Sequence, residues 1–272
     1  MIHARDLSQK VGEHLGENYI VRPAMRYGSV SIEKAIDSLI DSEVHKLIIF
    51  PLFPQYASST TGSLLEEVFR VLRAKTNIPA VTTIPPFYNH PLYIESLART
   101  ALPYLEKPHD HVLFTFHGLP EKHILKSNQG KDHCLKKDDC CNRIHQQNQF
   151  CYRAHCYETA RSLAKKLKIQ EENYSVSFQS RMGKHPWIQP YTESILESMP
   201  EKGIKNLIVL CPSFIADCLE TLEEIAIRGT EVFVSAGGES LSMVPALNSD
   251  AFWSQTVATI IHGEQEEVNN PQ

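Results

Sequence analysis

The fold of this chain is decided by the stretch Lys205-Asn-Leu-Ile-Val-Leu-Cys-Pro-Ser-Phe214. Its near-continuous run of Leu, Ile and Val is typical of a strand that is buried on both faces, as in a parallel sheet. A similar stretch occurs earlier as Lys46-Leu-Ile-Ile-Phe-Pro-Leu-Phe53. Each is followed by a Thr, a Leu and a glutamate pair, Glu66-Glu67 in the first case and Glu223-Glu224 in the second. The two stretches indicate an internal repeat.

A second pair of segments supports the repeat. The pattern Asn-Tyr-x-Val-x4-Arg-x-Gly occurs at 18–28 and, with identical spacing, at 173–183. Each copy predicts a short strand that runs into a loop marked by Gly. Buried strands that alternate with amphipathic helical stretches are typical of parallel sheets. We therefore expect an α/β fold of two similar, doubly wound parallel-sheet domains.

The predicted elements divide into an N-terminal domain at 1–108 and a C-terminal domain at 109–272, which ends with a helix at about 250–262. The first domain is predicted to have strands at 19–25, 46–50 and 80–84. The second is predicted to have strands at 111–116, 174–179, 205–210 and 230–234. The strand at 111–116 has no counterpart before the first helix, at 3–16, so the first strand of the N-terminal domain is expected to be missing.

Composition argues against several classes of function. The 272 residues carry a formal net charge of −5 at a pI near 6.2, without the clustered Lys and Arg of a nucleic-acid-binding surface. The longest apolar runs, 47–53 and 207–211, are far shorter than the roughly 20 residues of a membrane-spanning helix. We expect a soluble, cytoplasmic protein that does not bind nucleic acid. Peripheral membrane association and oligomeric state stay open.

Polar side chains at the predicted strand ends are candidates for chemistry, because ligands bind at that edge of parallel sheets. His117 ends a strand, where an imidazole can accept a proton or ligate a metal, although most such residues are ordinary loop residues. Glu220 and Glu224 share one face of the next helix, which is about as often plain helix-starting chemistry. Trp187, in the polar loop 178–187, would form the floor under a flat ligand or, more commonly, cap a core.

Five of the seven cysteines fall within one window, which forms a Cys-rich insertion at 121–156: Cys134, Cys140, Cys141, Cys151 and Cys156. The uneven clustering of an odd number favours a reducing compartment and metal or redox chemistry over disulfides. Thiolates prefer zinc or iron-sulfur iron, and four of them suffice for a cluster. The alternative is a set of free thiols on a disordered insert.

Ordered blocks of the sequence resemble the ferrochelatase family over nearly the whole chain. The blocks are Phe53-Pro-Gln-Tyr56 with Ser59-Thr60-Thr61-Gly62, His117-Gly-Leu-Pro120, Gln179-Ser180-Arg181, Pro186-Trp187 and Asp217-Cys-Leu-Glu-Thr-Leu-Glu-Glu224. The resemblance implies an enzyme of heme biosynthesis that inserts ferrous iron into protoporphyrin IX to give protoheme. The sequence itself does not decide between protoporphyrin and coproporphyrin.

The resemblance also implies roles for individual residues. Porphyrin is expected in a cleft between the two domains, with His117 and Glu220 binding the incoming iron and moving protons. Glu224 would continue that acidic line. Iron insertion must remove pyrrole protons while it delivers a divalent ion, and an imidazole opposite carboxylates meets both needs. The residues expected to bind porphyrin are Tyr56, Ser59, Thr60, Gln179, Arg181 and Trp187.

Three features set this sequence apart within the family pattern. Position 218 is Cys where some ferrochelatases have His, so the proton path there is expected to differ. The family normally begins with a strand and a Gly-Thr-Pro loop, whose absence here predicts an N-terminally truncated form. The cysteine insertion resembles that of a subgroup with a 2Fe-2S cluster inside the chain. It predicts such a cluster without deciding which four thiols bind it.

Two other functions are compatible with the sequence. One is another tetrapyrrole chelatase, of the cobalt or siroheme type, which the fold alone does not separate from a ferrochelatase. The other is a non-catalytic remnant that binds porphyrin or a cluster, which the missing strand favours. Iron-dependent loss of free-porphyrin fluorescence would distinguish an enzyme from a binder.

Overall fold

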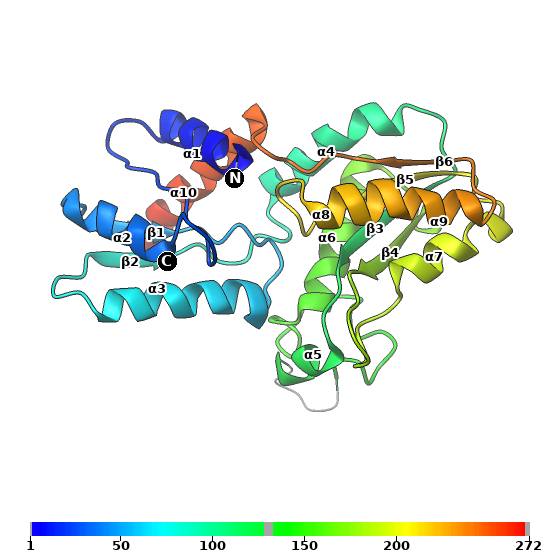
Figure 1. Ribbon diagram of the computed structural model, residues 1–272, viewed down its shortest axis with the longest axis horizontal. Coiled ribbons are helices and arrows are strands. Elements are labelled where there is room, and N and C mark those ends of the chain that lie inside the picture. Colours follow the sequence, from blue (N-terminus) through cyan, green and yellow to red (C-terminus); the bar gives the residue numbers. More distant parts are fainter. Residues whose placement is uncertain (1, 128–132, 270–272) are drawn as a thin grey trace. The chain divides into compact units, whose positions relative to one another are not determined.

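The computed structural model describes residues 2–127 and 133–269 (Figure 1). The chain forms two compact units. Unit 1 comprises the residues up to Pro86 together with those from Asn248 onward, and unit 2 comprises Phe87–Leu247. Of the predicted insertion at 121–156, residues 128–132 lie outside the described residues.

Unit 2 is built on a parallel sheet with the strand order β4-β3-β5-β6. The strands are β3 (His111–His117), β4 (Tyr174–Gln179), β5 (Asn206–Leu210) and β6 (Ser240–Met243). The register pairs His117 with Gln179 and Phe114 with Leu210. β3 is buried along nearly its whole length, as expected for a central strand covered on both faces. The carboxyl ends of β3 and β4 therefore lie side by side.

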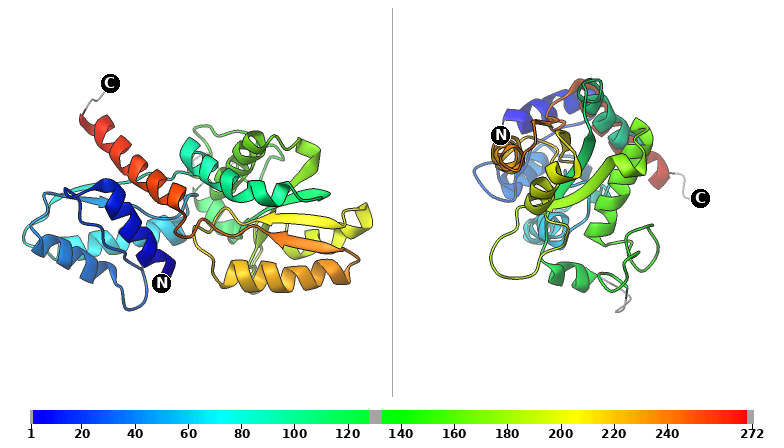
Figure 2. Two further views of the ribbon diagram at one scale, coloured as in Figure 1. Left: turned by 90° about the horizontal axis from the view of Figure 1, so that it is seen from above. Right: turned by 90° about the vertical axis from the view of Figure 1, so that its right-hand side faces the viewer.

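Helices cover both faces of this sheet (Figure 2). On one face lie α4 (Pro91–Leu105) and α6 (Tyr152–Leu167), which pack against each other. On the other lie α7 (Thr192–Ser198) and α9 (Thr230–Ser235), and the core between these helices and the sheet includes Leu196, Val209 and Phe233. The remaining short helices of unit 2 are α5 (Glu121–Ser127), η2 (Glu171–Asn173), η3 (Pro200–Lys202), α8 (Leu219–Thr221) and the π-helix η4 (Leu222–Gly229).

One strand predicted in unit 2 is wrong. Residues 230–234 form helix α9, which continues directly from α8 and η4, and the strand of the sheet is β6 at Ser240–Met243. The segment Thr-Glu-Val-Phe-Val has the β-branched and aromatic residues typical of strands. Its Phe233 nevertheless fills the core from a helix, and Gly237, at φ 99°, ends the helical run. Tertiary packing thus overrides the local propensity.

Unit 1 has a parallel pair of strands, β1 (Lys46–Ile49) and β2 (Ala80–Thr83), in register from Lys46 opposite Ala80. Helices α2 (Ile32–Asp41) and α3 (Ser63–Arg73) bury their apolar faces with β1, through Ile36, Leu47 and Val71 among others. A π-helix, η1 (Ser58–Gly62), leads into α3. Helices α1 (Ile2–Leu15) and α10 (Ala251–Asn269) pack against each other.

The strand predicted at 19–25 is also wrong. In the described residues this segment pairs with no strand, and only Met25 forms an isolated bridge, to Ser31. Its repeat partner β4 is an edge strand that, among the described strands, pairs with β3. The unit 1 sheet, in its described part, has no strand beside β1 in the position that β3 holds beside β5. An extended segment without a neighbouring strand has no ladder to join.

The packing groups the helices differently from the predicted boundary at 108/109. Helix α4 belongs to unit 2, where Tyr93 Oη donates a hydrogen bond to the Pro212 carbonyl at 2.5 Å. Helix α10 belongs to unit 1, where it packs on α1. The chain thus passes from unit 1 to unit 2 and back, a path that periodicity along the sequence does not reveal.

Candidate active site

His117 is held in one tautomer at the end of β3. Its Nδ1 lies 2.6 Å from the carbonyl oxygen of Gly118. Because a carbonyl can only accept, Nδ1 carries the proton and Nε2 presents a free lone pair. The His117 ring is half-buried, and the rings of Trp187 and Phe214 lie 6.4 and 6.2 Å away between centroids. Nε2 is therefore available as a base or a metal ligand.

The backbone of His117 is anchored from helix α6. Tyr152 Oη donates to the His117 carbonyl at 2.8 Å and lies 3.1 Å from Ser213 Oγ, in the loop after β5. Burial raises the pKa of Tyr152 well above its ordinary value, so its hydroxyl remains a donor. No feature of the sequence pointed to Tyr152, because its role depends on α6 crossing the end of β3.

Gln179 occupies the matching position on β4, and its side chain is only 2% exposed. Its Nε2 donates to the Glu220 carbonyl at 2.6 Å, and its Oε1 accepts from Thr115 Oγ1 at 3.2 Å. The Gln179 carbonyl accepts from the Gly118 amide at 2.8 Å. A Cβ at position 118 would lie 2.8 Å from that oxygen, so the approach requires glycine. Gln179 thus ties β3, β4 and α8 together.

Glu224 is clamped by Ser180. Its Oε1 accepts from the Ser180 amide at 2.7 Å and its Oε2 from Ser180 Oγ at 2.6 Å. Ser180 has φ 64°, in the left-handed region that disfavours residues other than glycine. Glu224 lies on η4, and π-helical turns occur frequently at functional sites. The two hydrogen bonds hold a strained loop residue and a carboxylate in one geometry.

Glu220 lies in α8, half-buried, at the start of the same helical run. Burial, together with a hydrogen bond to Glu220, raises the pKa of the nearby Cys218 thiol to about 11. A protonated thiol therefore stands where some relatives are expected to have His. Through the Gln179 side chain, Glu220 and Glu224 are both connected to the strand end that carries His117.

The loop 180–190 carries the remaining site candidates of unit 2. Trp187 is half-buried, pairs with Pro120 in an antiparallel bridge and donates from Nε1 to the Met182 carbonyl at 2.9 Å. Arg181 is exposed, with its guanidinium 4.5 Å from the centre of the Tyr191 ring. A flat aromatic and a solvent-facing cation suit a flat ligand with carboxylate groups.

The other three candidates belong to unit 1. Tyr56 is half-buried in the loop after β1, and Ser59 and Thr60 lie on η1, with Ser59 exposed. Thr60 Oγ1 donates to the Ala57 carbonyl at 3.4 Å. The π-helices η1 and η4 thus follow equivalent strands of the two units, β1 and β5. The internal repeat extends to this unusual helical geometry.

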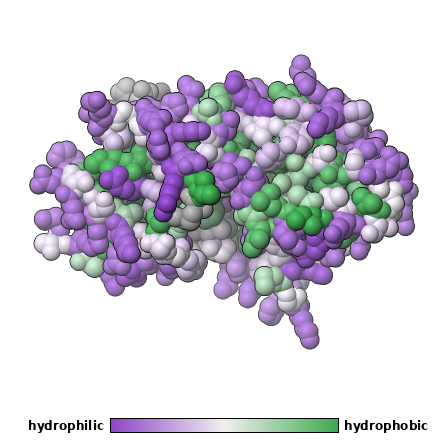
Figure 3. All heavy atoms as spheres, turned by 45° about the horizontal axis from the view of Figure 1, so that its top comes forward, coloured by the Kyte–Doolittle hydropathy of each residue, from purple (hydrophilic) through white to green (hydrophobic). Residues whose placement is uncertain are grey.

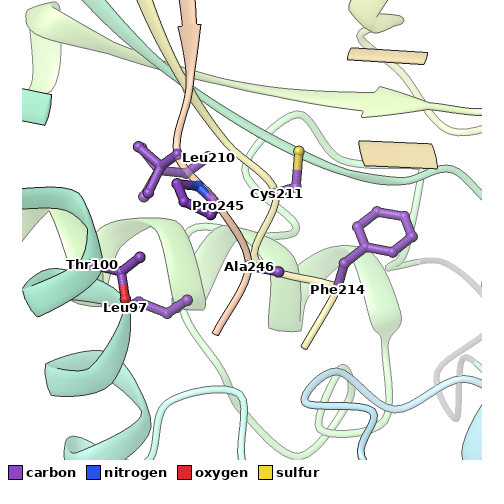
Figure 4. Close-up of a pocket in the computed structure, with 8 residues that line it drawn as sticks. Leu97, Thr100, Leu210, Cys211, Phe214, Pro245 and Ala246 are labelled. Carbon is purple, nitrogen blue, oxygen red and sulfur yellow. The ribbon is translucent and has the colours of Figure 1, made fainter. Parts of the chain in front are cut away.

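A small apolar cavity of about 10 Å³ lies beyond the carboxyl end of β5, lined by Leu210, Cys211, Phe214 and Val244 among others (Figure 4). This volume accommodates about one water molecule at most. It is far too small for a macrocycle. On the face shown in Figure 3, hydrophobic surface occurs in separate patches between hydrophilic side chains. Among the described residues, no helix has the length and apolar character needed to cross a membrane.

Four of the five clustered cysteines lie next to one another, and all five are buried free thiols. We call Cys134, Cys140, Cys141 and Cys151 the thiol group. The sulfur atoms of Cys140 and Cys141 are 3.7 Å apart. A hydrogen bond with Cys151 lowers the pKa of Cys134, and another raises that of Cys141. Cys156 instead contacts the side chain of Tyr152, and burial raises its pKa well above the ordinary value.

The thiol group matches the donor chemistry of an iron-sulfur cluster, which needs soft, buried thiolate ligands. Its sulfur atoms make pairwise contacts, and within residues 2–127 and 133–269 no three or more His, Cys, Asp or Glu side chains are arranged as a metal site. The donor set fits such a cluster by residue type, whereas the described side chains are not arranged around a common centre.

Comparisons with known proteins agree on one family. The ferrochelatase family model matches residues 1–265. The chain is 45% identical to the ferrochelatase of Ectopseudomonas mendocina over 91% of its length and 74% of that protein. It is 44% identical to the ferrochelatase of Coxiella burnetii, over 95% of this chain and 72% of the relative.

Solved structures share the fold at low identity. SirB from Bacillus subtilis with Fe3+ matches with a TM-score of 0.64 at 10% identity, covering 98% of this chain and 91% of that one. CbiX, described as the terminal enzyme for biosynthesis of siroheme in denitrifying bacteria, matches with a TM-score of 0.56 at 15% identity, over 96% and 90% of the two chains. At these identities the likeness extends to the chelatase-like fold alone.

Proposed function

The chain belongs to the ferrochelatase family and inserts ferrous iron into a porphyrin in heme biosynthesis, and we propose that His117 Nε2 is the group that takes pyrrole protons and meets the incoming iron. The observation that supports this role is the bond from Nδ1 to the Gly118 carbonyl at 2.6 Å. It leaves the Nε2 lone pair free. When Nε2 accepts a proton, the same bond stabilises the imidazolium, because Nδ1–H then becomes a charge-assisted donor.

Glu220 supplies the negative charge that attracts ferrous iron in this proposal. A carboxylate removes part of the penalty for stripping water from a divalent ion, and oxygen ligands suit ferrous iron. The hydrogen bond from Gln179 Nε2 to the Glu220 carbonyl fixes the backbone from which this carboxylate projects. Glu224 follows on η4, with both oxygens bonded to Ser180. We assign Glu224 the secondary role of holding loop 180–190 beside the helical run formed by α8 and η4.

We further propose that Trp187 and Arg181 of unit 2 contact the porphyrin. For Tyr56, Ser59 and Thr60 of unit 1, porphyrin binding stays a prediction from the resemblance. Trp187 offers a flat face, and Arg181 offers a cation for the propionates. Gln179 takes a different role from the one that the resemblance implies. Since it is 2% exposed and fully engaged with Thr115 and Glu220, it positions the site instead of touching the ligand.

The test replaces His117 with Ala and follows both porphyrin binding and iron-dependent loss of porphyrin fluorescence. We expect insertion to fall by at least about a hundredfold, with the porphyrin Kd within about tenfold. His109→Ala is the matched control, because its Nδ1 also bonds a carbonyl, that of Lys107 at 2.8 Å, at the opposite end of β3. Normal turnover in the His117 variant, or equal losses in both, would remove His117 from the mechanism.

Protoporphyrin IX is the porphyrin that we propose, and the cytoplasm is the proposed location, since seven unpaired cysteines suit a reducing compartment. The ratio of kcat/KM for protoporphyrin and coproporphyrin tests the choice of porphyrin. A higher value for coproporphyrin would reassign the substrate.

For the thiol group we propose that Cys134, Cys140, Cys141 and Cys151 hold a 2Fe-2S cluster. Their adjacency and burial support this assignment, and Cys156 is left out because it contacts Tyr152. Protein purified without oxygen should be brown, with iron and acid-labile sulfide in equal amounts. Cys141→Ser should abolish the sulfide, whereas Cys156→Ser should retain it. Colourless protein, or loss of sulfide only in the Cys156 variant, would contradict the assignment.

A further inference from the structure

Arg153 is a half-buried cation at the start of α6, with contacts to the thiol group and to loop 180–190. It follows Cys151 and Tyr152 directly in the chain. In the part of the chain that the structure describes, no carboxylate forms an ion pair with it, whereas Arg161 on the same helix pairs with Glu158 at 2.6 Å. A charge that is partly removed from water is usually held by a polar partner, because its desolvation is costly. The partner of Arg153 must be sought among its other contacts.

One side of the guanidinium faces sulfur. Nη1 lies 3.1 Å from Cys141 Sγ, which belongs to the thiol group. The guanidinium also stacks on Tyr157, 4.7 Å from the ring centre, and Nη2 donates to the Tyr157 hydroxyl at 3.2 Å. A neutral thiol is only a weak acceptor, whereas a metal-bound thiolate is an anion. The stacked, immobilised guanidinium is therefore placed for a thiolate.

The other side faces loop 180–190. Nε and Nη2 both donate to the carbonyl of Gln189, at 3.4 and 3.3 Å. Gln189 lies two residues after Trp187 in the loop that also carries Arg181 and Ser180. One rigid side chain thus spans from a sulfur of the thiol group to the backbone of the loop that borders the proposed site.

We propose that Arg153 is the cationic partner of the metal-bound thiolates, and that it couples metal binding at the thiol group to the order of loop 180–190. The inference rests on the proposed role of the thiol group. When a metal binds, each ligating thiol releases its proton to solvent and its sulfur donates an electron pair to the metal. The negative charge of the bound thiolates strengthens the N–H···S bond of Arg153. This bond holds the guanidinium at hydrogen-bond distance from the Gln189 carbonyl.

The experiment measures hydrogen exchange of peptides within 181–190 by mass spectrometry, with and without zinc. Zinc is the probe because it binds thiolates without redox chemistry. Zinc stoichiometry is measured in parallel on the full chain. We expect zinc to slow exchange of the loop by about threefold or more in the unmodified protein. Arg153→Met should still bind zinc, with the loop unprotected.

Arg161→Met is the matched control, since Arg161 bonds the Cys141 carbonyl at 2.8 Å but, in the described part of the chain, neither the Cys141 sulfur nor loop 180–190. It should show the protection of the unmodified protein. If Arg153→Met fails to fold, Arg153→Lys decides. Lys keeps the charge but lacks the planar fork needed to bridge both partners, so zinc should bind with reduced protection. Full protection in either Arg153 variant overturns the coupling alone. A protein that binds no zinc overturns the thiol-group assignment and the coupling together.

Discussion

Two substitutions of Ser180 separate the contribution of its hydrogen bond to Glu224 from that of its strained backbone, in the contact between loop 180–190 and helix η4. Ser180→Ala removes the hydroxyl that donates to Glu224 Oε2 at 2.6 Å but retains the amide that donates to Oε1. It also retains the unfavourable φ of 64°. Ser180→Gly removes the same hydroxyl and relieves the backbone strain. The two variants therefore lose the same hydrogen bond and differ in conformational energy.

The magnitudes follow from these contacts. A hydrogen bond to a charged group contributes about 1.5 to 3 kcal/mol, and Glu224 is half-buried, so we expect Ser180→Ala to cost about 2 kcal/mol. Left-handed backbone costs a residue other than glycine about 1 to 2 kcal/mol, from which the larger entropy of unfolded glycine subtracts about 0.4 to 1 kcal/mol. Ser180→Gly should therefore be more stable than Ser180→Ala by about 0.5 to 1 kcal/mol.

The assay is urea unfolding followed by circular dichroism. With a slope of about 2 kcal/mol per molar urea, the midpoint should fall by about 1 M in Ser180→Ala and by about 0.5 to 0.75 M in Ser180→Gly. Ser127→Ala is a suitable control, because the bond that its hydroxyl makes within the described residues is to the Ile124 carbonyl of the short helix α5. An unchanged midpoint in Ser180→Ala would refute the clamp. A Gly variant less stable than the Ala variant would refute the strain.

Three further predictions concern Glu220, Glu224 and the residues that contact them. Glu220→Gln should lower turnover by at least about a hundredfold. Glu224→Gln should lower it by less, since both Glu224 oxygens already bond Ser180. Equal and negligible effects of the two substitutions would contradict this order. Gln179→Ala should lower kcat by about tenfold with the porphyrin Kd within about threefold, and a larger change in Kd would make Gln179 a ligand contact. Burial and the bond to Glu220 raise the pKa of Cys218 to about 11, so the rate of its alkylation by iodoacetamide should rise with a midpoint near pH 11. In Glu220→Gln this midpoint should move to lower pH. An unchanged midpoint would exclude the bond between Cys218 and Glu220. Because the folded pKa is the higher one, the stabilisation from this thiol is complete below pH 9 and is lost as the pH rises to about 11.

Local pattern was sufficient for three of the four strands of the unit 2 sheet. The apolar runs at 111–116, 174–179 and 205–210 form β3, β4 and β5, because a strand buried on both faces needs continuous apolar residues whatever its neighbours are. The repeat likewise predicted two similar units. At 230–234 the same reasoning failed, since strand-forming residues there pack Phe233 into the core from a helix.

Pairing depends on what the rest of the chain provides, and only the tertiary structure decided it. The segment 19–25 has strand-like composition but, in the described residues, no strand to pair with. The sequence likewise indicated that five cysteines belong together without distinguishing Cys156, which the turn of α6 directs toward Tyr152.

For the site, the sequence alone determined the chemical inventory: an imidazole at a strand end, carboxylates one helical turn apart and an aromatic loop. These are consequences of residue type and spacing. The tertiary structure decided their states, including the tautomer of His117, the burial of Gln179 and the clamp on Glu224. Each of these states depends on an atom that a distant segment or a locally folded turn brings to hydrogen-bond distance. The order of residues along the chain does not show which atoms are brought together in this way.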